Sequence, residues 1–86
     1  MKTVFSNHAE IEMLRRNVER KHILSVVKNP QQKFKDGNKK WIYQSKYFDD
    51  GLKKEMLLRI FAEEDLKGIK VITTYKTSKI SKYWKV

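Results

Sequence analysis

The sequence predicts an α+β domain in which two N-terminal helices pack on a four-stranded antiparallel meander sheet. Three observations lead to this prediction. Apolar residues recur at helical spacing up to residue 28, the period changes to two from residue 32 onward, and turns that contain glycine divide the second part into strands. The chain has 86 residues and no linker rich in Pro, Gly or Ser, so we expect a single domain over residues 1–86.

The first helix is expected to begin at a cap supplied by Ser6 or Asn7 and to run to Arg16. Asn17 follows, and asparagine tolerates the left-handed backbone with which helices often end. Apolar residues at helical spacing should face the core, while Glu10 and Arg16 should face solvent. The expected apolar residues of this helix and its end are Ile11, Met13, Leu14 and Val18.

A second helix is expected from Glu19 to Lys28, because apolar residues 23, 26 and 27 share one face. It should stop before Pro30, since the residue that precedes a proline disfavours the helical conformation. Residues 4–5, ahead of the first helix, are interpreted either as a short strand or as an apolar lead-in.

Turn signals at 36–37, 50–51 and 65–68 separate four expected strands. The strands lie around Phe34, from Trp41 to Phe48, from Met56 to Ala62, and from Ile69 onward. The third strand is apolar on both faces except at Arg59, which is typical of a central strand.

The last strand alternates with period two and is rich in β-branched residues. Strict alternation would place Ile69, Val71, Thr73 and Tyr75 on one face. It would place Lys70, Ile72, Thr74 and Lys76 on the other face.

The charge balance predicts a polyanionic partner. The chain has 20 Lys and Arg against 10 Asp and Glu, a formal net charge of +10. Nucleic acid is the first candidate, followed by an acidic protein. A membrane partner is not expected, because no helix sets a Lys/Arg face against a Trp/Phe face. The absence of a signal peptide and of cysteine fits a cytoplasmic protein without disulfides or thiol chemistry.

Two residues are candidates for chemistry. His8 lies at the start of the first helix, and histidine is the side chain most suited to proton transfer at physiological pH, so it is either a general acid or base or a structural histidine of the first turn. Arg59 is either a phosphate ligand in a cleft or a guanidinium satisfied by Glu10, Glu12 or a backbone carbonyl. His22 is interpreted as a surface residue. We expect neither a metal nor another cofactor, because no ligand set has metal-site spacing.

The C-terminal end of the last strand collects groups that suit phosphate and bases. Lys76 and Lys79 are interpreted as phosphate ligands or as part of a solvated basic tail. The rings of Tyr75 and Tyr83 either stack bases or form the edge of the core. The hydroxyl groups of Thr77 and Ser78 add hydrogen bonds. The substrate-binding candidates are Arg16, Tyr75, Lys76, Thr77, Ser78 and Tyr83.

Several short motifs occur in a familiar order: His8-Ala9, Arg16-Asn17-Val18, Pro30, Leu58-Arg59-Ile60, residues 71–75, Thr77-Ser78-Lys79 and Tyr83. Together they resemble small bacterial proteins related to the BrnT toxins and to the wider RelE-like superfamily. The resemblance implies a ribonuclease-like sheet-and-helix fold. It also implies the toxin of a type II toxin–antitoxin pair, which cuts RNA without a metal and is held inactive by a small acidic antitoxin.

The resemblance assigns catalysis to His8 as acid or base, with Arg59 and Lys79 on the scissile phosphate and Tyr75 or Tyr83 positioning the nucleotide. Glu12 stands where the family has an arginine. This departure favours an alternative, a non-catalytic module of the same fold that binds RNA or an acidic protein. Homodimerisation is left open.

Overall fold

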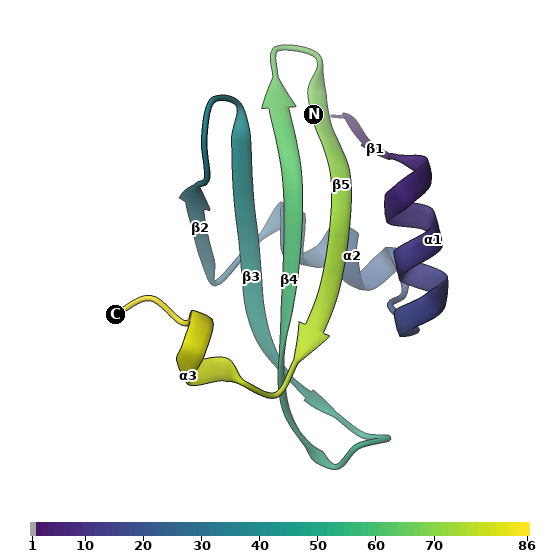
Figure 1. Ribbon diagram of the computed structural model, residues 1–86, viewed down its shortest axis with the longest axis vertical. Helices are drawn as coiled ribbons and strands as arrows, with labels where there is room; N and C mark the ends of the chain where they lie inside the picture. The colour runs from purple at the N-terminus through teal and green to yellow at the C-terminus, as the bar shows by residue number, and fades with distance from the viewer. Residues whose placement is uncertain (1) are drawn as a thin grey trace.

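The structure is a computed structural model that describes residues 2–86 (Figure 1). The described chain forms, in order, β1 (Lys2–Phe5), α1 (Asn7–Arg16), α2 (Arg20–Lys28), β2 (Gln32–Lys35), β3 (Lys40–Asp49), β4 (Lys54–Asp65), β5 (Gly68–Thr77) and α3 (Ile80–Tyr83). The predicted α+β class, both N-terminal helices and the meander of β2 to β5 are confirmed.

The sheet has five strands in the order β1-β5-β4-β3-β2, so the predicted four-stranded sheet was one strand short. Residues 4–5 belong to the additional strand, which confirms the strand alternative for this segment. β1 pairs in parallel with β5, from Lys2 opposite Gly68 to Phe5 opposite Val71. The other neighbouring pairs are antiparallel. A segment of 4 residues is too short to show alternation in the sequence. Its pairing depends on the otherwise free edge of β5, which only the folded sheet presents.

Ser6 fixes the start of α1 to the edge of β5. Its Oγ accepts a hydrogen bond from the Ala9 N–H at 3.0 Å, which caps the helix, and donates one to the Ile72 carbonyl, also at 3.0 Å. The Ser6 N–H donates to the Val71 carbonyl at 2.9 Å. The helix ends at Asn17 in the left-handed conformation, with φ 55 and ψ 50, as predicted. α1 therefore runs along β5 from where β1 stops.

The face of α1 that packs on the sheet is only partly the predicted one, because Met13 and Val18 are buried as predicted whereas two other apolar residues are not. Ile11 and Leu14 are 55% and 85% exposed. The buried residues of the helix are Ala9, Glu12 and Met13. Alanine permits a close approach to β5, and two arginines of the same helix neutralise Glu12, as described below. A carboxylate at a buried position is tolerated when it is paired, and apolar spacing alone does not reveal such a pairing.

The hydrophobic core lies between one face of the sheet and the helices α1 and α2. It contains Leu58, Ile60 and Ala62 of β4 together with Ile23 and Val26 of α2 and other buried residues. Trp41, Tyr43 and Tyr47, which alternate along β3, also face this side. In Figure 1, α2 lies behind the sheet and α3 lies on the viewer's side. We call the side of the sheet opposite α2 the open face.

A β-bulge in β5 changes which residues share a face. Phe61 pairs with Thr73, whereas its neighbour Ala62 pairs with Val71, so Ile72 is the additional residue. Ile69 and Val71 join the core before the bulge, and Thr74 and Lys76 face the core side after it. Thr73, Tyr75 and Thr77 therefore lie on the open face. The predicted strict alternation was wrong because one inserted residue reverses the side-chain direction of everything beyond it.

The close approach of β1 to β5 requires glycine at position 68. Gly68 has φ +146, and a Cβ atom there would lie 2.2 Å from the Lys2 carbonyl oxygen. We expect Gly68→Ala to lower the free energy of unfolding by about 2–4 kcal/mol, because backbone strain and a steric clash act together. Chemical denaturation followed by circular dichroism measures this change.

Gly37 supplies the matched control for Gly68→Ala. It also has a positive φ, +130, but an added Cβ would meet only the Lys40 side chain, at 3.8 Å. Gly37→Ala should therefore cost about 1 kcal/mol, from backbone conformation alone. Equal losses in the two variants would show that the contact between β1 and β5 does not limit stability.

Candidate anion-binding site on the open face

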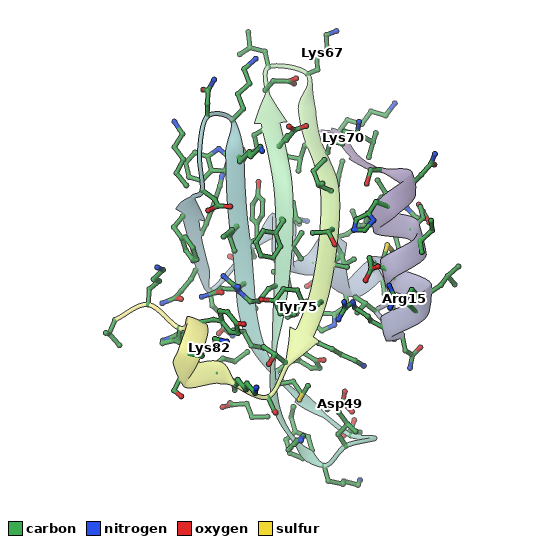
Figure 2. All side chains as sticks on the ribbon, in the orientation of Figure 1. Arg15, Asp49, Lys67, Lys70, Tyr75 and Lys82 are labelled. Carbon is green, nitrogen blue, oxygen red and sulfur yellow. The ribbon has the colours of Figure 1, made fainter. Side chains whose placement is uncertain are left out.

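The centre of the open face is formed by three residues in register on adjacent strands. Arg59 of β4 lies opposite Gln44 of β3 and opposite Tyr75 of β5. Figure 2 shows Tyr75 over the lower half of β4 and β5, with Lys82 on α3 to one side. Antiparallel partners project to the same face of a sheet, so the three side chains meet there.

Arg59 is held in place by neutral partners. Its Nε donates to Gln44 Oε1 at 2.9 Å, and its Nη1 donates to the Tyr75 hydroxyl at 2.7 Å. The guanidinium carbon lies 4.2 Å from the centre of the Tyr83 ring and 5.2 Å from that of Phe61. The two hydrogen bonds use two of the five N–H groups of a guanidinium, which leaves donors for a ligand.

No carboxylate within residues 2–86 forms an ion pair with Arg59, although the side chain is only 7% exposed. The predicted alternative partners Glu10 and Glu12 bind other arginines. Buried charges are normally paired, and the aromatic rings here compensate this charge only in part. The site therefore has an excess positive charge that an anion with two oxygen acceptors matches well.

Tyr75 and Tyr83 form an aromatic pair beside the guanidinium, with ring centres 6.1 Å apart and planes at 73°. Burial raises the pKa of Tyr75, and the hydrogen bond from Arg59 acts against this rise. The hydroxyl of Tyr75 and then Lys82 lower the pKa of Tyr83. The two neighbouring hydroxyls therefore differ in acidity, and Tyr83 is the better proton donor of the pair.

Arg16 of α1 also reaches this cluster. Its guanidinium carbon lies 5.8 Å from the centre of the Tyr75 ring. Its Nε donates to Glu12 Oε2 at 2.6 Å, and Arg15 Nη1 donates to Glu12 Oε1 at 2.8 Å. The hydrogen bond from Arg16 is the main cause that lowers the pKa of Glu12, against the opposing effect of burial. Glu12 thus orients Arg16 and offsets part of its charge.

The lowered pKa of Glu12 predicts a loss of stability in acid. The carboxylate stabilises the fold above its unfolded pKa of 4.5, and this contribution disappears as the pH falls through the lower folded value. Glu12→Gln should therefore be less stable than the parent at pH 7 and should lose less stability between pH 7 and pH 3. Urea unfolding at both pH values measures this, and identical pH dependence in the two proteins would contradict it.

The C-terminal segment is fastened over the open face by two glutamines that the sequence interpretation did not single out. Gln44 Nε2 donates to Gln32 Oε1 at 2.7 Å and to the Tyr83 carbonyl at 3.1 Å. Gln32 Nε2 donates to the Lys85 carbonyl at 2.6 Å, and the Lys85 N–H donates back to Gln32 Oε1 at 3.1 Å. Polar residues at paired positions of neighbouring strands are a possible signal for this arrangement, but the register has to be known first.

His8 lies at the edge of the open face. It is exposed in the first turn of α1, one turn before Glu12. Residues four apart share a side of a helix, so the imidazole lies on the same side as Glu12 and Arg16. The rise of a helix places it roughly 12 Å along the axis from Arg16. The sequence-predicted acid or base is therefore at the margin of the site and not inside the Arg59 cluster.

The remaining predicted site residues do not all lie on the open face. Lys76 faces the core side, with Nζ 3.8 Å from Asp49 Oδ2 and 3.5 Å from the Asn17 carbonyl, so it is not brought to the Arg59 cluster. Thr77 is on the open face, and its Oγ1 accepts the Lys79 N–H at 3.0 Å. Ser78 and Lys79 are exposed between β5 and α3.

His22, expected at the surface, is half-buried instead. Its ring packs edge to face on Tyr47, with centres 4.6 Å apart, and burial lowers its pKa. The position lies on the side of the sheet that carries α2, because Tyr47 packs against the core. Within residues 2–86, no group of three or more His, Asp or Glu is arranged to hold a metal ion.

These features define a small α+β domain with α1 and α2 packed on one side of a mixed sheet and a cationic, aromatic cluster on the other. The chain belongs to the family described as a domain of unknown function, DUF4258, whose model matches residues 5–80. Arg16, Arg59, Tyr75 and Lys79 lie within the matched range, whereas Tyr83 lies beyond it. Neither a curated protein nor a solved structure matches the chain. No helix in the described part of the chain is long and apolar enough to cross a membrane.

Proposed function

We propose that the protein binds single-stranded RNA on the open face and cleaves it without a metal, as the toxin of a type II toxin–antitoxin pair. The observation that carries the proposal is the buried guanidinium of Arg59, which lies among aromatic rings and has no carboxylate partner in the described part of the chain. A phosphodiester supplies two acceptor oxygens for its remaining donors. The rings of Tyr75 and Tyr83 suit the stacking of unpaired bases, which is how sheet surfaces commonly bind RNA.

In the proposed reaction, the 2′-oxygen of a ribose forms a bond to the adjacent phosphorus while the bond from phosphorus to the 5′-oxygen breaks. The proton leaves the 2′-hydroxyl for a base, and an acid returns a proton to the 5′-oxygen. We assign one of these two roles to His8, which lies outside the Arg59 cluster, so the bound strand has to extend from Arg59 along α1 to the first turn of that helix. Arg59 and Lys79 stabilise the charge that develops on the phosphorane, with Arg16 beside them. The products end in a 2′,3′-cyclic phosphate and a 5′-hydroxyl.

A second candidate is a non-catalytic module that uses the same face to bind RNA or an acidic protein. Glu12 favours it, because this carboxylate binds Arg16 and reduces the positive charge on the α1 side of the site. In either case the formal net charge of +10 suits an acidic protein partner, and under the first proposal that partner is the antitoxin.

The deciding experiment is an RNA-cleavage assay of the purified protein in excess EDTA, with free and ribosome-bound RNA and with the product ends identified. Cyclic phosphate ends support the first proposal. RNA binding without cleavage at any pH favours the second. Under both, log Kd should vary with log salt by about 0.7 per neutralised phosphate for single strands. A slope near zero would indicate a protein partner instead of RNA.

A further inference from the structure

A hollow of about 280 Å³ opens beside the Arg59 cluster, between β3, β4 and β5. Its lining combines two aromatic residues, including Trp41, and two aliphatic ones, including Ala62, with charged and hydroxyl groups. The residues that matter are Phe61, Ile72, Thr73, Asp36, Lys40 and Glu63. In register, Phe61 and Glu63 follow Arg59 along the same side of β4, so the hollow continues the open face toward the turn between β4 and β5.

The hollow and the Arg59 cluster share the Phe61 ring. This ring is 5.2 Å from the Arg59 guanidinium carbon and is stacked on Tyr75, with centres 5.9 Å apart and planes at 21°. Alternate residues of a strand are roughly 6.6 Å apart. A ligand with a phosphate at Arg59 therefore extends into the hollow without leaving the sheet. Apolar contact with Phe61 and Ile72 suits a planar group there.

The polar groups of the hollow include two carboxylates, Asp36 and Glu63, beside the Lys40 ammonium and the Thr73 hydroxyl. Asp36 and Glu63 are both exposed carboxylates, and an ionised carboxylate only accepts hydrogen bonds. Glu63 lies in register between Lys40 and Lys70, which offsets its repulsion of an RNA chain. A base with an exocyclic amino group donates to such carboxylates, as adenine and cytosine do. Uracil presents a carbonyl oxygen, O4, where cytosine has its amino group, and carboxylates repel this oxygen.

We propose that this hollow is a base-binding subsite that selects amino-bearing bases over uracil, an inference that rests on the proposed RNA-binding function. Phe61 supports the plane of the base, and Asp36 and Glu63 accept its amino protons. The subsite lies beside the phosphate-binding arginine, so it determines which nucleotide is placed next to the scissile bond.

The test compares the affinities of the full-length protein for short oligo(A), oligo(C) and oligo(U) RNAs by fluorescence anisotropy at one salt concentration. The parent protein should bind oligo(A) and oligo(C) about tenfold more tightly than oligo(U). In the double variant D36N/E63Q, the amides donate to uracil oxygens and the preference should fall to about twofold or less. Circular dichroism checks that the variant is folded.

The variant D50N/E55Q is the matched control, because it removes two negative charges from the turn region between β3 and β4, outside the hollow. It should keep the parent's base preference. Any gain in RNA affinity that comes only from the loss of two negative charges should appear in this variant as it does in D36N/E63Q. A parent without base preference, or a preference unchanged in D36N/E63Q, would overturn the subsite while leaving RNA binding intact. Failure of the parent to bind any of the RNAs would overturn the proposed function and the subsite together.

Discussion

Replacing Arg59 with methionine should lower RNA affinity by at least tenfold and the cleavage rate by about 100-fold to 1000-fold. Methionine fills a similar apolar volume between the rings but removes the charge and every donor. Gln44 Oε1 and the Tyr75 hydroxyl lose the hydrogen bonds that they accept from Arg59, which should also cost about 1–3 kcal/mol of stability. Anisotropy, single-turnover cleavage and urea unfolding measure the three effects separately.

Lys76 provides the charge-matched control for Arg59. It follows Tyr75 directly on β5 but faces the side of the sheet that carries the core, near Asp49. Lys76→Met removes the same unit charge from the same part of the molecule. Because this charge does not contact RNA on the open face, only its weaker long-range attraction is lost, and we expect RNA affinity to change less than threefold. Equal losses in the two variants would mean that overall charge, and not the open face, governs RNA binding.

His8→Ala should reduce the rate of RNA cleavage by about 100-fold to 10000-fold while leaving RNA affinity nearly unchanged. The imidazole transfers a proton in the proposed reaction, and it is exposed at the edge of the site, so its removal disturbs neither the core nor the Arg59 cluster. Cleavage under single-turnover conditions, with saturating protein, separates the chemical step from binding.

His22 is the only other histidine in the sequence and serves as the control for His8. It packs on Tyr47, away from the open face, so His22→Ala should leave cleavage unchanged and lower stability modestly. Full activity in His8→Ala would contradict its assignment as acid or base. The next candidate for the acid would then be Tyr83, the tyrosine beside Arg59 whose pKa is lowered.

Local signals in the sequence were sufficient for most of the secondary structure. The stop at Asn17, the break before Pro30 and the turns at 36–37, 50–51 and 65–68 predicted where elements end, because these residues restrict the backbone directly. Such signals act within a few residues and need no knowledge of neighbouring strands.

The candidate site was predictable only in part. Arg59 stood out as the one cation in an apolar strand, and the structure places Arg16, Tyr75 and Tyr83 around it. Lys76 was grouped with them by sequence proximity but faces the other way. Gln44 gave no signal, although it is completely buried and contacts both Arg59 and the C-terminal segment. Its role depends on strand register, which a single strand does not encode.

The sequence by itself determined the α+β class, the order of the helices and meander strands, and the excess of positive charge. Only the tertiary structure decided which residues of α1 and of the second half of β5 face the core. The bulge at Ile72 turned Tyr75 toward Arg59, and the pairing of Glu12 with two arginines left Ile11 and Leu14 exposed. Local propensity fixes backbone conformation along the chain. The direction of a side chain also depends on register and on partners supplied by distant segments.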